Sequence, residues 1–151
     1  MRFKTMPRSP KTLRLSVDLE AQLQREFARR GIQEWSAGVV ELLSEAIRMR
    51  SVPGIGFTDS VTGRRPVIAG TGIEVWEIIA MLKSVKGDEG KLSRAFHWLT
   101  PVQMRAAVAY YKLYPEEIDR RIALDESWTP DRIRREMGFT ALGPGLRAVK
   151  R

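Results

Sequence analysis

The segment from Lys11 to Asp18 alternates apolar and polar residues, a pattern typical of a short β-strand with one apolar and one polar face. The apolar positions are Leu13, Leu15 and Val17, and the polar positions are Thr12, Arg14 and Ser16. The residues that follow have helical spacing and offer no hairpin partner. Because a lone strand of about six residues is not stable in water, the segment needs a partner strand, which the same segment of a second copy can supply.

Two helices are predicted after this strand. The first begins with Asp18 as its N-cap, repeats apolar residues at Leu19, Leu23 and Phe27, and ends near Gly31. The second begins with Ser36 as its N-cap and has a broad apolar face up to about residue 50. The sequence therefore predicts a complete strand–helix–helix unit over residues 11–50.

The rest of the chain is predicted to be mainly helical. Residues 51–65, rich in Gly, Pro, Ser and Thr, indicate a linker, and residues 66–126 a second, helical domain. This domain is predicted to begin with a short strand or extended segment around Val67 and Ile68, followed by a helix from Trp76 to about Val85. Within that domain Thr100, Pro101 and Gln103 form the pattern of a capping box with proline at the first helical position. Spacing places Val102, Ala106, Ala109 and Leu113 on the inward face of that helix. Residues 127–151 contain a further helical pattern and a tail.

Composition and charge exclude several classes of protein. The chain has no cysteine and one histidine, His97, so it offers no ordinary zinc site, and we expect neither catalysis nor a metal or cofactor. No stretch approaches the roughly 20 apolar residues of a membrane span, and the expected location is cytoplasmic. The net charge of +8 and the pI of about 10.3 favour a polyanionic partner. Residues 1–10 form a basic arm that contains Arg2, Lys4 and Arg8.

The stretches "TLRLSV", "DLEAQLQREFARRG" and "WSAGVVELLSEAIRMR" resemble the ribbon-helix-helix proteins of the Arc, MetJ and CopG kind. The resemblance implies a homodimer in which the two strands pair antiparallel, and a two-stranded ribbon fits the DNA major groove. Arg14 is then the candidate for a bidentate guanine contact. Ser36, with the free backbone amides of Ala37 and Gly38 at the start of the second helix, is expected to anchor a phosphate. The full set of candidate DNA contacts is Lys11, Thr12, Arg14, Ser16, Ser36, Ala37, Arg2, Lys4 and Arg8. The alternative is a dimerisation ribbon whose polar face meets only water.

The stretches "GRRPVIAGTGIEVWEIIAMLK" and "FHWLTPVQMRAAVAYYKLYPEEID" resemble the family named domain of unknown function 433. That resemblance implies a small fold with a helix-turn-helix whose turn is "HWLTP". Gln103, Arg105 and Lys112 are polar candidates for a second DNA contact. A second dimer interface or a platform for a partner is the alternative.

The order of these parts resembles the VapB-type antitoxins that accompany PIN-like ribonuclease toxins. The resemblance implies autorepression through operator DNA and inhibition of the toxin by basic side chains laid against its carboxylates. Candidate toxin contacts are Trp128, Arg132, Ile133, Arg135, Met137 and Phe139. Two alternatives stay open. In one, this segment packs on its own domain through Trp128. In the other, the protein is a free-standing regulator whose second domain serves oligomerisation or sensing.

Overall fold

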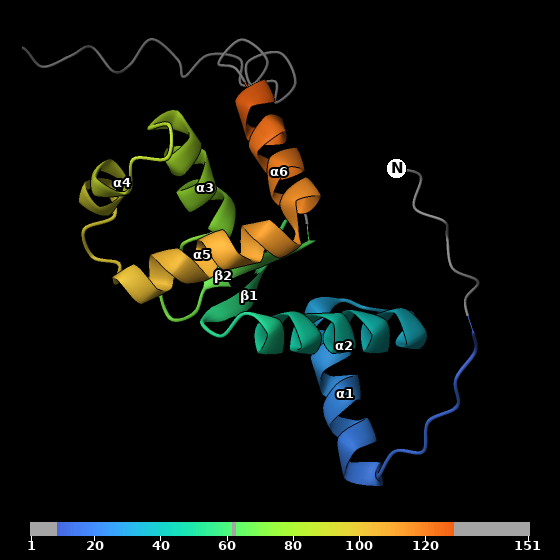
Figure 1. Ribbon diagram of the computed structural model, residues 1–151. Coiled ribbons are helices and arrows are strands. Elements are labelled where there is room, and N and C mark those ends of the chain that lie inside the picture. Colours follow the sequence, from blue (N-terminus) through green and yellow to red (C-terminus); the bar gives the residue numbers. More distant parts are fainter. Residues whose placement is uncertain (1–8, 62, 129–151) are drawn as a thin grey trace, which may run out of the picture. The chain divides into compact units, whose positions relative to one another are not determined.

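The computed structural model describes residues 9–61 and 63–128 of the 151-residue chain. It divides into two compact units, unit 1 up to Ile47 and unit 2 from Arg48 onward. The elements are α1 (Val17–Arg30), α2 (Trp35–Ser51), β1 (Ile55–Ser60), β2 (Gly63–Ile68), α3 (Val75–Ser84), α4 (Glu89–Ala95), α5 (Pro101–Leu113) and α6 (Pro115–Ser127), as Figure 1 shows. The described part is mainly helical, which confirms the predicted fold class at that level.

In unit 1, local hydrogen bonds fix both ends of α1. Ser16, not Asp18, is the N-cap: its Oγ accepts a hydrogen bond from the Leu19 amide at 3.3 Å. Asp18 lies instead in the first turn, where a carboxylate interacts favourably with the helix dipole. The helix ends as predicted at Gly31, whose φ of 69° is the left-handed conformation that glycine adopts without a steric penalty.

The contact between α1 and α2 is centred on Phe27. Phe27 is buried and meets the edge of the Trp35 ring, with centroids 6.5 Å apart. Gly38 lies against the same phenyl ring so closely that an added Cβ would be 2.6 Å from Phe27 Cε1. The two helices therefore pack at a position where only glycine fits.

A second link between α1 and α2 is ionic. Arg30, whose side chain is almost fully buried, contacts Glu26 at 2.7 Å, Glu41 at 3.0 Å and Glu45 at 3.3 Å. Hydrogen bonds from Arg29 and Arg30 lower the pKa of Glu26 to about 2. Burial of the Arg30 guanidinium is thus accompanied by three carboxylates that satisfy it.

In unit 2, β1 and β2 form an antiparallel hairpin with Ile55 opposite Ile68 and Ser60 opposite Gly63. The prediction of a linker over residues 51–65 is wrong, because this interval contains all of β1 and the start of β2, and Val52 and Ile55 are core residues. The glycine and proline residues of this interval belong to a β-hairpin and not to a linker between domains. The predicted extended segment around Val67 and Ile68 is confirmed as part of β2.

Helices α3, α5 and α6 pack against one another, and α3 and α5 also contact the hairpin. Thr100 and Gln103 form the predicted capping box at the start of α5, with Pro101 in its first turn. The core residues come from every element of the unit: Val52, Ile55, Ile68, Val75, Ile78, Ile79, Leu92, Leu99, Ala106, Ala107, Tyr110, Ile118 and Ile122.

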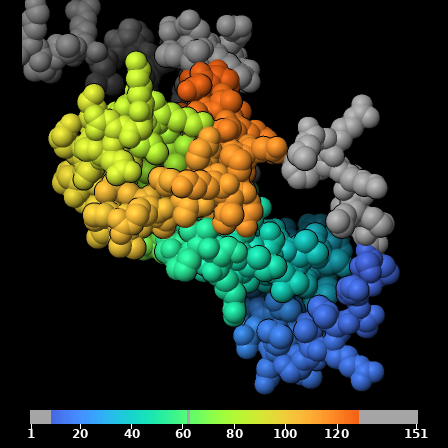
Figure 2. All heavy atoms as spheres, in the orientation of Figure 1, coloured from blue at the N-terminus to red at the C-terminus, as the bar shows by residue number. Residues whose placement is uncertain are grey.

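The inward face of α5 differs from the predicted one. Of the four predicted residues Ala106 is buried, but Val102, Ala109 and Leu113 are exposed, and Ala107 and Tyr110 are buried in their place. Figure 2 shows α5, in gold to orange, at the surface of unit 2. The helix is rotated relative to the prediction because the Tyr110 ring, and not the aliphatic side chains, fills the space beside β1.

Tyr110 also holds a polar group inside unit 2. Its hydroxyl accepts a hydrogen bond from Arg48 Nη1 at 2.8 Å and donates one to Glu117 Oε1 at 3.2 Å, while Arg48 contacts Glu117 directly at 2.6 Å. Burial, together with the nearby Glu117 carboxylate, raises the pKa of Tyr110. Arg48 also lies 4.5 Å from the centre of the Tyr114 ring. These contacts fasten the C-terminal end of α2 to α5 and α6.

Candidate functional site

Residues 9–16, which include most of the predicted strand segment, form neither helix nor strand within the single chain, whereas Val17 and Asp18, at the end of that segment, lie in the first turn of α1. Residues 9–16 make no ladder with any other described residue. Ser16, at the end of the segment, has extended backbone angles, φ −70° and ψ 153°. A ladder between two copies needs a second chain, so the pairing stays a prediction.

The apolar residues of unit 1 are largely uncovered. The large side chains exposed on unit 1 are Leu13, Val17, Leu19, Trp35, Val40, Leu43 and Ile47, and we call this set the apolar face of unit 1. Val17 is 82% exposed and Val40 66% exposed, while among residues 9–47 Phe27 is the large apolar residue that is fully buried. A domain that leaves this much apolar surface in water lacks part of its core.

The polar positions of the segment are accessible. Lys11, Thr12 and Arg14 are exposed, and their side chains make no hydrogen bond or ion pair with another described residue. Ser16 is exposed too, but its Oγ is already an acceptor for the α1 cap. Arg2, Lys4 and Arg8 lie outside the described residues. Arg14 is therefore a guanidinium that remains available to a ligand.

The start of α2 differs from its predicted state. Glu34, rather than Ser36, satisfies this end of the helix: its carboxylate accepts hydrogen bonds from the amides of Ser36 at 3.2 Å and Ala37 at 2.5 Å. The Gly38 amide donates to the Glu34 carbonyl. The expectation that Ala37 and Gly38 offer free amides to a phosphate is thus wrong, because a phosphate would first have to displace a carboxylate.

Of the candidate toxin contacts, the structure describes Trp128 alone. It is half-buried and follows the last turn of α6, with its amide donating to the Asp125 carbonyl at 3.0 Å. Arg132, Ile133, Arg135, Met137 and Phe139 lie outside the described residues. The side chains predicted for a second DNA contact lie on α5, where Gln103 is engaged in the capping box while Arg105 and Lys112 are exposed.

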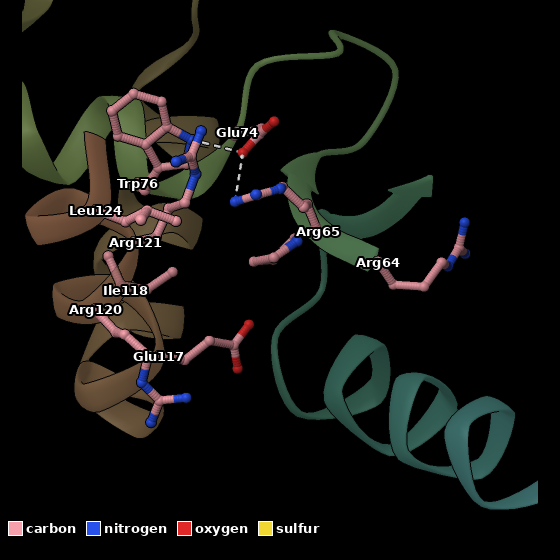
Figure 3. Close-up of a pocket in the computed structure, with 10 residues that line it drawn as sticks. Arg64, Arg65, Glu74, Trp76, Glu117, Ile118, Arg120, Arg121 and Leu124 are labelled. Atoms are coloured by element: carbon pink, nitrogen blue, oxygen red, sulfur yellow. Dashed lines mark hydrogen bonds and ion pairs between the residues drawn. The ribbon is translucent and has the colours of Figure 1, made fainter. Parts of the chain in front are cut away.

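The sequence did not predict a pocket that lies between β2, the start of α3 and α6. It has a volume of about 240 Å³ and is lined by Arg64, Arg65, Pro66, Glu74, Trp76, Glu117, Ile118, Arg120, Arg121 and Leu124. Figure 3 shows Arg65 and Arg121 directed toward Glu74 and Trp76, whereas Arg64 and Arg120 point outward at the rim. The repeated Arg-Arg pairs in β2 and α6 were the available signal, but only the fold brings them together.

Aromatic stacking and hydrogen bonds fix the side chains of this pocket. The Arg121 guanidinium lies 4.7 Å from the centre of the Trp76 ring, and Trp76 Nε1 donates to Glu74 at 2.5 Å. Glu74 also faces Arg65 at 3.7 Å. Glu117 is held from the other side by Arg48 and Tyr110.

Other chemistry has little support in the described part of the chain. It contains no group of three or more His, Cys, Asp or Glu residues arranged to hold a metal ion. His97 is exposed, and its ring lies edge-on to that of Trp98, with the two ring centroids 4.8 Å apart. Among the helices of residues 9–61 and 63–128, none has the length and apolar character needed to cross a bilayer.

Comparison with known proteins gives one match. Residues 55–111, from the start of β1 to near the end of α5, match the family described as "Protein of unknown function (DUF433)". This confirms the family resemblance predicted for this part of the chain. No similar curated protein and no similar solved structure was found. The matched segment includes the β2 and α3 walls of the pocket, while α6 lies beyond it.

Proposed function

We propose that the protein is a homodimeric DNA-binding regulator and the antitoxin of a type II toxin–antitoxin system. In this proposal the ribbon-helix-helix unit, residues 11–50, dimerises and binds operator DNA. The C-terminal segment from Trp128 onward binds and neutralises a PIN-like ribonuclease, and operator binding represses the protein's own operon.

The uncovered apolar face of unit 1 is the observation that carries the dimer. Its member Leu13 and the half-buried Leu15 lie on a segment without a strand partner, and the exposed Val17 follows as the first residue of α1. Antiparallel pairing of two copies would satisfy the backbone of that segment and cover these side chains at the same time. One association thus accounts for two features that are unfavourable in the single chain.

The DNA contact follows from the parity of the paired segment. When Leu13 and Leu15 of the extended segment face the dimer core, Thr12, Arg14 and Ser16 must face away from it. Arg14 has no ionic partner among the described residues, so its guanidinium can make a bidentate contact with guanine. The basic composition adds contacts to phosphates that do not depend on sequence.

Variants of two arginines test the DNA contact. We expect Arg14→Ala to weaken binding to the DNA upstream of the protein's own coding sequence by at least about fivefold, because a bidentate guanine contact is worth roughly 1–3 kcal/mol. Arg25→Ala removes an equal charge from the exposed surface of α1 and should change the affinity far less. Fluorescence anisotropy at fixed salt concentration measures both. Equal affinities for wild type and Arg14→Ala would show that the ribbon face does not read DNA.

Truncation tests the antitoxin role. A protein lacking residues 129–151 retains every described helix and strand, so we expect it to bind DNA like the full chain and to fail to capture or inhibit the ribonuclease. Affinity purification from the native host, with identification of the bound proteins, provides the partner for the assay. Retained inhibition by the truncated protein would move the inhibitory surface into residues 1–128. Recovery of DNA without a protein partner would favour the alternative, a free-standing regulator.

A further inference from the structure

We infer that the pocket between β2, α3 and α6 binds a small organic anion, a carboxylate or phosphate attached to an apolar body. This inference is independent of the proposed antitoxin function. It rests on the charges, the apolar lining and the fixed geometry of the pocket in unit 2.

Positive charge is in excess in this pocket. Its lining contains four arginines and two glutamates. Both glutamates are engaged: Glu74 by Arg65 and the Trp76 indole, and Glu117 by Arg48, which lies outside the pocket lining. The nearest carboxylate to Arg121 is Asp125, at 4.0 Å, and Arg121 Nε is buried without a hydrogen-bond partner among the described residues. Arg64, at the rim, is paired with Asp59 at 3.0 Å, so the positive charge that the described residues leave in excess is that of Arg120 and Arg121. An anion at this place would compensate it.

The arginines nearest the centre of the pocket are held in place. Stacking on Trp76 fixes the plane of the Arg121 guanidinium, and a hydrogen bond from Arg65 Nε to Ser60 Oγ at 2.9 Å anchors Arg65. Both are directed toward the same side of the pocket (Figure 3). Guanidinium groups ordered before binding lose less side-chain entropy when a ligand binds.

The remaining lining selects for an apolar body. Pro66 and Ile118 are buried, Leu124 lies at the exposed rim, and the Trp76 ring forms one wall. The volume of about 240 Å³ lies below the roughly 300–1,000 Å³ of pockets for drug-sized ligands. The pocket therefore fits a metabolite-sized molecule with one anionic group better than a bare inorganic ion.

The test uses the full chain and four probes. Sodium benzoate carries a carboxylate on a phenyl ring, and phenyl phosphate carries a phosphate on the same kind of ring. Benzamide is the uncharged counterpart of benzoate, and inorganic phosphate is an anion without an apolar body. Binding is followed by the indole N–H signal of Trp76 in ¹H–¹⁵N spectra at constant ionic strength. That signal is assigned by its loss in Trp76→Phe, since the chain has four tryptophans.

We expect saturable shifts of the Trp76 signal with benzoate, with phenyl phosphate or with both, and binding at least about tenfold weaker for benzamide and for inorganic phosphate. Which of the two anions binds more tightly identifies the preferred group. Arg121→Gln should weaken binding of the preferred anion by a similar factor. Arg105→Gln, which removes a charge from the exposed surface of α5, should not change it.

If Arg121→Gln does not give a native spectrum, Arg65→Gln replaces it with the same expectation. Equal shifts by benzoate and benzamide, or binding unchanged in the folded arginine variants, would overturn the inference. A shift of the Trp76 signal by a DNA duplex and by none of the small anions would also overturn it and assign the arginines to nucleic acid. None of these outcomes depends on capture of a toxin, so failure here is distinguishable from failure of the proposed function.

Discussion

At the scale of single residues, Tyr110 shows how one side chain can serve both core and network. Its ring is fully buried in unit 2, and its hydroxyl lies between Arg48 and Glu117. Without that hydroxyl the guanidinium and the carboxylate would each lose a hydrogen bond in a partly buried place. The residue therefore couples the C-terminal end of α2 to α6.

We expect Tyr110→Phe to lower the free energy of unfolding of unit 2 by about 1–2 kcal/mol, because two hydrogen bonds to charged groups are lost while the ring is kept. Tyr114→Phe is the matched control, since the Tyr114 hydroxyl has no hydrogen bond with a described residue and its ring stacks at 4.8 Å from that of Tyr110. Urea denaturation of both variants measures the difference. An equal effect of the two substitutions would mean that the network contributes nothing to stability.

Residue identity alone predicted some of these roles and missed others. The Thr100–Gln103 capping box is formed as predicted because all of its bonds lie within four residues. Glu34 was missed because its carboxylate competes with Ser36 for the same helix end, and local preference favours the serine. Charges that act across the fold, such as Arg65 and Arg121, cannot be paired from the sequence.

At the scale of elements, the packing of α1 on α2 depends on the absence of a side chain at Gly38. We expect Gly38→Ala to destabilise unit 1 by about 1–3 kcal/mol despite the better helix propensity of alanine, since the new methyl group would meet the buried Phe27 ring. Gly90→Ala is the control, because a methyl group there meets only the side-chain ends of Asp88 and Arg94. Thermal unfolding followed by circular dichroism compares the two, and a stabilised Gly38→Ala would contradict the close contact.

The sequence predicted the bounds of helices more accurately than it predicted which face of a helix is buried. Helix α3 was predicted over 76–85 and spans Val75–Ser84, because propensity and spacing determine where a helix can form. The buried face of α5 was predicted wrongly, because several faces carry apolar residues and only the contacts with the rest of unit 2 decide which is covered. The hairpin was read as a linker for a related reason: glycine and proline are common to both, and pairing is a tertiary property.

At the scale of the whole molecule, the two units differ in how complete their cores are. Unit 2 has thirteen buried residues in one cluster, while unit 1 leaves its apolar face exposed in the single chain. If a second copy completes the core of unit 1, the stability of unit 1 therefore depends on the protein concentration. The core cluster of unit 2 is already formed within a single chain.

We expect the hydrogen-exchange protection of α1 to rise with protein concentration while that of α3 stays constant. Mass spectrometry of peptides from the two helices, over a hundredfold range of concentration, measures both in the same sample. Unit 2 thus acts as the internal control. Protection of α1 that does not depend on concentration would show that unit 1 is stable as a monomer, and the proposed ribbon would lose its main support.

The position of Glu34 at the start of α2 has a consequence for the search for a DNA site. In the proposed complex, a phosphate gains this helix end only by expelling a carboxylate that already holds the amides of Ser36 and Ala37. In a short-lived complex with nonspecific DNA, a phosphate would then gain no hydrogen bond from these amides and would be repelled by the Glu34 carboxylate. A ribbon fully seated in its groove could still make the exchange. Glu34 would thereby shorten the lifetime of complexes with competing sequences more than that of the complex with the operator. The ratio of specific to nonspecific binding decides whether a regulator finds one site in a genome.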